Sequence, residues 1–223
     1  LPSGQLCTVV GSSDQNAALF SVQPAVAADG TLTYTPAANA SGSATITVIA
    51  KDDGGTANGG VDTSASQTFV ITVNEVNDAP SFTAGGTVTV NEDSAAYSAV
   101  WATAISAGPN ETQNLTFVLS GNTNPGLFAS GPSIAADGTL SFTLAANQNG
   151  SASLSVVLTD DGGTANGGVD TSTSATLNIT VTAVNDAPSF TGSGNVTVLE
   201  DSGAYSAAWA TAISAGPADE SGQ

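Results

Sequence analysis

Acidic side chains recur in two short motifs along this chain. Asp-Asp-Gly-Gly occurs at 52–55 and again at 160–163, and Asn-Asp-Ala-Pro occurs at 77–80 and again at 185–188. Carboxylate and amide oxygens grouped in this way suit a hard divalent cation, which takes about six to eight oxygen ligands in a flexible site. The chemistry that these residues favour is therefore cation binding, with Ca²⁺ as the first candidate.

The charge balance favours the same chemistry and excludes other partners. The chain has 19 acidic residues, one basic residue (Lys51) and no His, which gives a formal net charge of −18. Such a surface repels nucleic acid and anionic lipid, so we expect neither as a partner. No stretch approaches the roughly 18 apolar residues that span a bilayer, so we expect no membrane insertion.

The sequence lacks His and the motifs of common catalytic centres. It contains no His, no Gly-x-Ser-x-Gly motif and no glycine loop that cradles phosphate before a helix. Paired carboxylates could serve a glycosidase, but here they recur at linkers, where no deep cleft is expected. We predict that the protein is not an enzyme.

Both acidic motifs are also good turn sequences, and this alternative stays open. Asn and Asp side chains cap the local backbone, Pro ends the preceding strand, and Asp-Gly favours a hairpin turn. Turn formation alone does not require clustered carboxylates that repel one another. The clustering therefore favours a cation over a plain turn.

The elements that position these motifs repeat along the chain. The sequence Asp-Asp-Gly-Gly-Thr-Ala-Asn-Gly-Gly-Val-Asp-Thr-Ser occurs at 52–64 and at 160–172, and Trp-Ala-Thr-Ala-Ile-Ser-Ala-Gly-Pro occurs at 101–109 and at 209–217. Each pair is offset by 108 residues (160 minus 52, and 209 minus 101). A period of this length matches a small autonomous domain better than a solenoid unit.

Within one period, apolar residues alternate with Thr and Ser, as they do in half-buried β-strands. Ala44, Ile46, Val48 and Ala50 alternate in this way, and clusters of Gly, Asn, Asp and Pro separate such runs. No segment shows a convincing helical period. The sequence predicts an all-β fold: tandem immunoglobulin- or cadherin-like antiparallel β-sandwiches with about seven strands per module.

The order of these motifs resembles a cadherin-like domain. An Asp-Asp-Gly-Gly turn, an alternating strand and then Val-Asn-Asp-Ala-Pro-Ser-Phe are similar to its last two strands and linker. The whole period resembles the long tandem repeats of bacterial surface adhesins and other giant extracellular repeat proteins. The resemblance implies calcium between consecutive modules, with ligands from both modules and from the linker.

The resemblance assigns ligands to three groups of residues. The linkers supply Asn77 and Asp78 at the first junction and Asn185 and Asp186 at the second. The acid near the first strand is Glu92 in one repeat and Glu200 in the next. The module after the first junction supplies Asp160, Asp161 and Asp170. At the second junction the corresponding carboxylates, Asp52 and Asp53, would come from the next copy of the chain, and Asp62 is the counterpart of Asp170.

The match to the family pattern is incomplete. The acid two residues before the linker Asn is present as Glu75 at the first junction, but it is replaced by Ala183 at the second. Ala79 and Ala187 stand where animal cadherins have a second linker Asn, and no Asp-Arg-Glu-like tripeptide is present. We therefore expect one or two ions per junction.

The repeat divides the chain into three segments. Residues 1–78 form a module that lacks its first strands, 79–186 form a complete module, and 187–223 carry the first strands of a further module. Two explanations compete: the chain is a slice of a longer tandem array, or its last segment completes residues 1–78 of the next copy by strand addition. Head-to-tail addition of this kind does not close, so it would build a fibre.

The leading hypothesis is a non-enzymatic, extracellular or cell-surface structural protein of bacterial type, used in adhesion or biofilm. It would form a calcium-stiffened stalk, or a filament whose partners are copies of itself. The alternative is a glycan- or surface-binding module of a large adhesin or secreted hydrolase, with Trp101 and Trp209 as sugar platforms. Because alternating strands normally bury their largest residues, these tryptophans fit a core role better.

Overall fold

The computed structural model of the protein describes residues 7–10 and 16–218, with side chains from Asn16 onward. β-Strands dominate this part of the chain, and its helical elements are 3₁₀ turns of three residues each. None of these helices is long and apolar enough to cross a membrane. The chain divides into two units: residues 1–78 with the segments Gly108–Thr112 and Gly163–Gly168, and the remainder.

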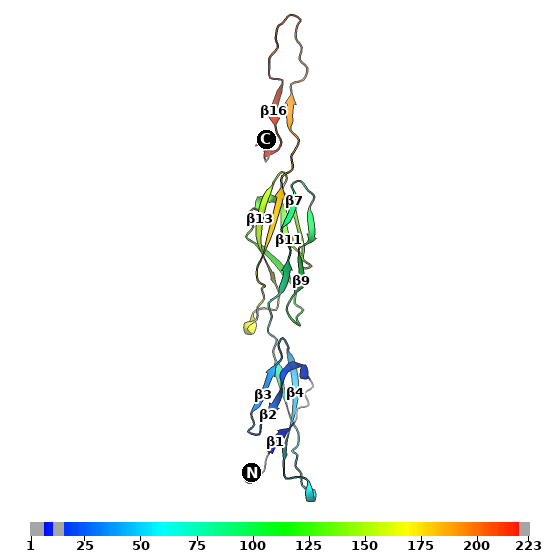
Figure 1. Ribbon diagram of the computed structural model, residues 1–223, viewed down its shortest axis with the longest axis vertical. Helices are drawn as coiled ribbons and strands as arrows, with labels where there is room; N and C mark the ends of the chain where they lie inside the picture. Colours follow the sequence, from blue (N-terminus) through cyan, green and yellow to red (C-terminus); the bar gives the residue numbers. More distant parts are fainter. Residues whose placement is uncertain (1–6, 11–15, 219–223) are drawn as a thin grey trace. The chain divides into compact units, whose positions relative to one another are not determined.

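The second unit contains a β-sandwich of two main sheets (Figure 1). Four strands in the order β10-β13-β14-β7 form one sheet, and three in the order β11-β12-β8 form the other, so the predicted all-β sandwich with about seven strands is confirmed. A further pair, β6 and β9, extends from it. The bounds are β6 (Ser81–Ala84), β7 (Val88–Asn91), β8 (Tyr97–Val100), β9 (Ala102–Ser106), β10 (Thr116–Ser120), β11 (Phe128–Ile134), β12 (Thr139–Leu144), β13 (Gly150–Thr159) and β14 (Ala175–Thr182).

Strict alternation of apolar and polar residues builds the core of this sandwich. In β12 and β13 every second side chain is buried, while Ser and Thr face outward. Leu140 from one sheet and Leu158, Leu177 and Ile179 from the other are fully buried in a single cluster. Burial of a side chain of this size stabilises the fold by about 1.5–3 kcal/mol.

One strand pairing differs from the antiparallel arrangement that the sequence predicts. β7 lies parallel to β14, with Ile179 opposite Val88 and Thr182 opposite Asn91. Parallel neighbours require a long connection, and nearly the whole module separates these two strands. A strand near the start of the module therefore pairs with its last strand. This pairing places Glu92, the residue after Asn91, at the start of the second linker.

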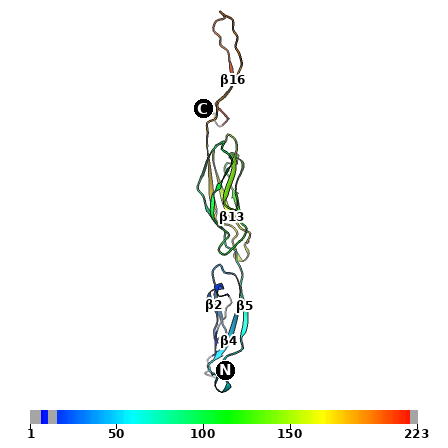
Figure 2. The same ribbon diagram turned by 90° about the vertical axis from the view of Figure 1, so that its right-hand side faces the viewer.

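The first unit holds two smaller sheets, with strand orders β1-β4-β5 and β2-β3 (Figure 2). Leu19 and Phe20 pack with Ala44, Ile46 and Ile71 in its core. Its strands are β1 (Cys7–Val10), β2 (Phe20–Val26), β3 (Leu32–Pro36), β4 (Gly42–Asp52) and β5 (Gln67–Val73). Among the described residues, β5 and β3 pair on one side only, whereas their counterparts β14 and β12 also pair with β7 and β8.

Side chains at matching repeat positions differ in burial because of this difference in pairing. Leu140 is 0% exposed and Phe142 is 4% exposed in the second unit. Their counterparts Leu32 and Tyr34 are 39% and 41% exposed. The apolar surface that β8 and the segment after it cover in the second unit is therefore open to solvent in the first.

Residues 189–214 reproduce only part of the fold of their counterparts at 81–106. β15 (Ser189–Gly192) pairs with β16 (Ala210–Ser214) in the same register, shifted by 108, as β6 with β9. Residues 193–209 between them form no strand, although the counterparts include β7 and β8 (Figure 1). Their apolar side chains are exposed, namely Val196, Val198, Leu199, Tyr205 and Trp209.

Candidate linker sites

The Asp-Asp-Gly-Gly loop of each repeat is held by hydrogen bonds within the loop. The Gly54 N–H donates to Asp52 Oδ1 at 2.8 Å, and the Gly162 N–H donates to Asp160 Oδ1 at 3.0 Å. The Asp52 N–H also donates to the Asp62 carbonyl at 2.9 Å. This is the geometry of the turn interpretation, in which an Asp side chain caps the backbone two residues on.

Most of the remaining carboxylates of these loops have a hydrogen-bond or ion-pair partner nearby. Asp161 accepts from the backbone N–H and the Nδ2 of Asn114, at 2.9 and 2.7 Å. These bonds, that of the side chain above all, lower the pKa of the exposed Asp161 carboxyl. Asp170 accepts from Thr171 Oγ1 at 2.9 Å, and Asp62 lies 3.7 Å from the Lys51 ammonium; Asp53 is exposed.

At the second linker, the side chain of Glu92 is buried against the linker backbone. Its side chain is only 2% exposed, although it is a carboxylate. Oε1 accepts the Val184 N–H at 2.6 Å, and Oε2 accepts from Asn149 Nδ2 at 3.3 Å. The backbone N–H of Glu92 donates to the Thr182 carbonyl at 3.0 Å. Glu92 therefore fixes the end of β14 to the start of the linker.

Replacement of Glu92 by Ala is expected to destabilise the second unit by about 2–4 kcal/mol. The substitution leaves the Val184 N–H without its acceptor and removes a charge-assisted hydrogen bond from a buried position. Thermal unfolding monitored by circular dichroism, at a concentration where the chain is monomeric, measures the effect. Glu200→Ala is the matched control, because Glu200 is exposed in the free chain; an equal loss in both variants would contradict the role of Glu92.

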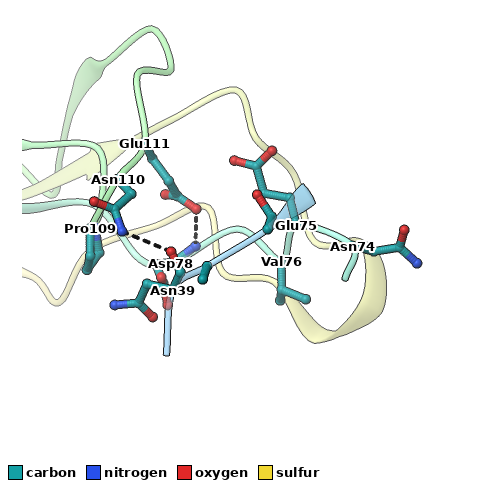
Figure 3. A pocket seen from close by; sticks show the side chains of 10 residues that line it. Asn39, Asn74, Glu75, Val76, Asp78, Pro109, Asn110 and Glu111 are labelled. Carbon is teal, nitrogen blue, oxygen red and sulfur yellow. Dashed lines mark hydrogen bonds between the residues drawn. The ribbon is translucent and has the colours of Figure 1, made fainter. Parts of the chain in front are cut away.

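The first linker packs against the loop 108–112, which belongs to the same unit. Glu111 Oε1 accepts the Asp78 N–H at 2.9 Å, and Asn110 Nδ2 donates to the Asn39 carbonyl at 2.9 Å, as the dashed lines of Figure 3 show. A cavity of about 210 Å³ lies beside these contacts. Its lining residues are Asn39, Ala40, Ser41, Asn74, Glu75, Val76, Asp78, Pro109, Asn110 and Glu111.

Glu111 is a site residue that the sequence analysis missed. Its Oε2 is buried and has no hydrogen-bond partner among the described residues, and it packs against Gly108, where a Cβ would overlap it. Gly108 has φ +150°, a conformation that glycine adopts readily. The signal was present, because an acidic residue follows Trp-Ala-Thr-Ala-Ile-Ser-Ala-Gly-Pro in both copies, although the second copy, at Asp219 and Glu220, lies outside the described residues.

The oxygen ligands beside the first linker are of the kind that calcium binds, but they do not lie close enough together to form a complete metal site. Glu75, Asp78 and Glu111 bring three carboxylates to one cavity, and hard cations take such oxygens. Yet in the described ranges no three acidic, His or Cys side chains lie close enough together to hold a metal ion. The predicted ligands Asn77 and Asp78 belong to the first unit, whereas Asp160, Asp161 and Asp170 belong to the second.

At the second linker, the predicted ligands Asn185 and Asp186 follow directly after the segment that Glu92 holds. Asn185 is exposed and donates from Nδ2 to the Asp186 carbonyl at 3.0 Å, and Asp186 is half-buried. Glu200 lies in the strandless stretch 193–209 and is exposed. The assignment of these residues as calcium ligands stays a prediction.

The two tryptophans lie in different surroundings. Trp101 is 4% exposed, packs in the core and donates from Nε1 to the Gly86 carbonyl at 3.0 Å. Trp209 makes the same type of bond to the Gly194 carbonyl at 2.7 Å but is 45% exposed. Trp101 therefore has the core role that the sequence favours.

Comparison with known proteins places the chain in a family. The model of the bacterial Ig domain matches residues 3–74 and 77–180. The chain belongs to the bacterial Ig domain family. A search of curated proteins found no match to it.

Solved cadherin structures share the fold of these bacterial Ig domains. Human protocadherin-24 EC1-2 (form II) is 17% identical, with a TM-score of 0.50, 81% of this chain covered and 82% of that one. Human CDH23 EC21-23 is 13% identical, with a TM-score of 0.50 and coverage of 84% and 66%. The predicted likeness to cadherin-like tandem repeats is confirmed for the fold.

Proposed function

We propose that this protein is a non-enzymatic, extracellular structural module of adhesion type, which builds a stalk or filament by head-to-tail strand addition. Residues 187–214, the donor segment, add to the first unit of a second copy. There they pair with β5 and β3, the acceptor strands. The bacterial Ig domain family and the tandem repeat support a structural role of this kind.

The donor segment matches in sequence the strands that complete the second unit, and this match is the observation that carries the proposal. Among the described residues, β5 and β3 pair on one side only. In the second unit, β14 and β12 bind β7 and β8 on the corresponding side. A shift of 108 residues places Val196 beside Ile71 and Tyr205 beside Tyr34, in the registers of Val88 with Ile179 and Tyr97 with Phe142. The donor segment therefore carries the sequence that the acceptor strands accommodate.

The expected energy of docking is comparable to the cost of association or larger. The donor segment exposes several large apolar side chains that are buried or half-buried at the counterpart positions in the second unit. Each stabilises the complex by about 1.5–3 kcal/mol when fully buried, against an association cost of about 4–15 kcal/mol. These side chains are Phe190, Val196, Val198, Tyr205, Trp209 and Ile213.

The assembly state of the intact chain tests this function. Analytical ultracentrifugation over a range of concentrations is expected to detect oligomers whose size grows with concentration, because head-to-tail addition has no closing step. A chain that stays monomeric throughout would overturn the proposal.

We also propose that calcium strengthens the linkers. The net charge of −18 and the carboxylates of Glu75, Asp78 and Glu111 beside one cavity support this role. A bound cation would neutralise the negative charge of these carboxylates. The chain's own contribution is to hold the linker in place, through Glu111 on the Asp78 N–H and through the packing of Gly108 against Glu111.

Chelation is expected to lower the melting temperature of the protein. Metal bound only by the folded form adds stability by mass action, and a concentration 100 times the Kd adds about 2.7 kcal/mol. Differential scanning calorimetry at low ionic strength, with EDTA and then with excess Ca²⁺, measures the shift. Identical curves would favour the plain-turn interpretation of both motifs, and Mg²⁺ at the same concentration controls for charge screening.

A further inference from the structure

We infer that the cavity of the first unit is a docking site for one carboxylate, that of Glu200 from a second copy of the chain. This inference rests on the proposed head-to-tail addition and names the polar contact that fixes it. Because strand side chains alternate with a period of two, a slip by two residues keeps the same face buried, so burial of the apolar face does not by itself choose between such registers. A buried carboxylate with defined donors would set the register to a single residue.

The second unit shows how such a carboxylate is held within one module. Glu92 accepts the Val184 N–H through Oε1 and the Asn149 amide through Oε2, while its own N–H donates to the Thr182 carbonyl. These three partners come from the end of β14, the linker and the residue just before β13. All of them lie within one unit, and Glu92 is buried among them.

The counterparts of these three partners all line the cavity of the first unit. A shift of 108 residues converts Val184 into Val76, Thr182 into Asn74 and Asn149 into Ser41. Each of the three belongs to the lining of the same cavity. The cavity therefore lies where the Glu92 counterpart of a completed sandwich would be.

The register of strand addition delivers Glu200 to this position. In the second unit Asn91 pairs with Thr182, and Glu92 follows it. The same register places Leu199 of the donor opposite Asn74, so that Glu200 follows at the cavity. In the free chain Glu200 is exposed and belongs to no strand, so it is accessible for docking.

One feature of the cavity opposes the entry of a carboxylate. Glu75 lines it, whereas the counterpart in the second unit is Ala183; Asp78 and Glu111 add further negative charge. Glu111 already accepts the Asp78 N–H. Because these carboxylates line one cavity, they lie within the Debye length of about 8 Å at 0.15 M ionic strength from an entering carboxylate, so salt weakens the repulsion only in part. The Ca²⁺ proposed for this linker would offset the remaining repulsion.

The test is a double-mutant cycle on the association of the full chain, measured by sedimentation at 0.15 M salt. Glu200→Ala is expected to weaken association about ten- to a hundredfold, because a hydrogen bond to a charged group is lost. Glu200→Gln retains one acceptor oxygen and should lose less. Ser41→Asn installs the amide that Asn149 provides in the second unit, and it should strengthen association several-fold.

The coupling between the two positions distinguishes this contact from a general charge effect. Ser41→Asn should have no effect in the chain that also carries Glu200→Ala. If Glu200→Ala and Glu200→Gln leave association unchanged, or both strengthen it, the docking of Glu200 is overturned while head-to-tail addition stands. If the intact chain does not associate at all, both are overturned. Circular dichroism at low concentration checks that each variant folds.

Discussion

Removal of residues 187–223 is expected to abolish association of the chain while leaving the second unit folded. Strands β6 to β14, which form that unit's sandwich, all lie within 79–186, so the deletion removes none of its core. The acceptor strands of the first unit remain, but the shortened chain has no donor segment that could pair with them. Analytical ultracentrifugation of the shortened chain should give a monomer at concentrations where the intact chain forms oligomers.

The separated donor segment provides the complementary measurement. A peptide of residues 187–218 added to the shortened chain should raise the melting temperature of the first unit, and the rise should increase with peptide concentration. A peptide with Trp209→Ala and Ile213→Ala is the matched control, since it lacks two of the apolar side chains that docking would bury. Strand addition would be contradicted if the shortened chain still formed oligomers, or if the peptide left its melting temperature unchanged.

Gly30→Ala is expected to block association through the acceptor side, lowering the affinity by at least about a hundredfold. The counterpart Gly138 has nearly the same conformation, with φ +86° against +87° for Gly30. A Cβ at Gly138 would overlap the Ala102 backbone oxygen, whereas a Cβ at Gly30 meets nothing within 4 Å in the free chain. On docking, Ala210 of the donor would take the place of Ala102 and collide with the new methyl group.

Gly59→Ala is the control for the backbone strain that Gly30→Ala introduces. Gly59 lies in the same unit with φ +83°, and a Cβ there also meets nothing within 4 Å. Both substitutions place Ala in a left-handed conformation, which costs roughly 1–2 kcal/mol. Thermal unfolding should therefore change by a similar amount in the two variants, whereas sedimentation should reveal lost association only for Gly30→Ala. Equal association in both would contradict docking at Gly30.

The sequence predicts the strands well because their signal is local. Alternation of Thr or Ser with apolar residues identifies β4, β12 and β13, since each residue's face in a strand follows from its position alone. The parallel pairing of β7 with β14 is not local in this sense. It depends on which sheet edge remains available after all the other strands have paired. The sequence of a short segment such as Val88–Asn91 does not indicate which edge this is.

The candidate sites were harder to predict than the strands. Glu92 was singled out through a resemblance, as a metal ligand, and that role stays a prediction; its two protein donors and its near-complete burial were not predicted from the sequence. Whether a carboxylate accepts an N–H or binds a cation depends on neighbours far away in the sequence. Glu111 shows the same limit, because its partner, the Asp78 N–H, lies 33 residues away.

The most direct test of the account mixes two variants that are each expected to be monomeric. The chain that lacks residues 187–223 keeps the acceptor strands, and the full-length Gly30→Ala chain keeps the donor segment. Head-to-tail strand addition predicts that an equimolar mixture forms a one-to-one complex that does not grow further, because neither exposed end can accept or donate again. Two species that remain monomeric in the mixture, while the intact chain forms oligomers, would contradict it.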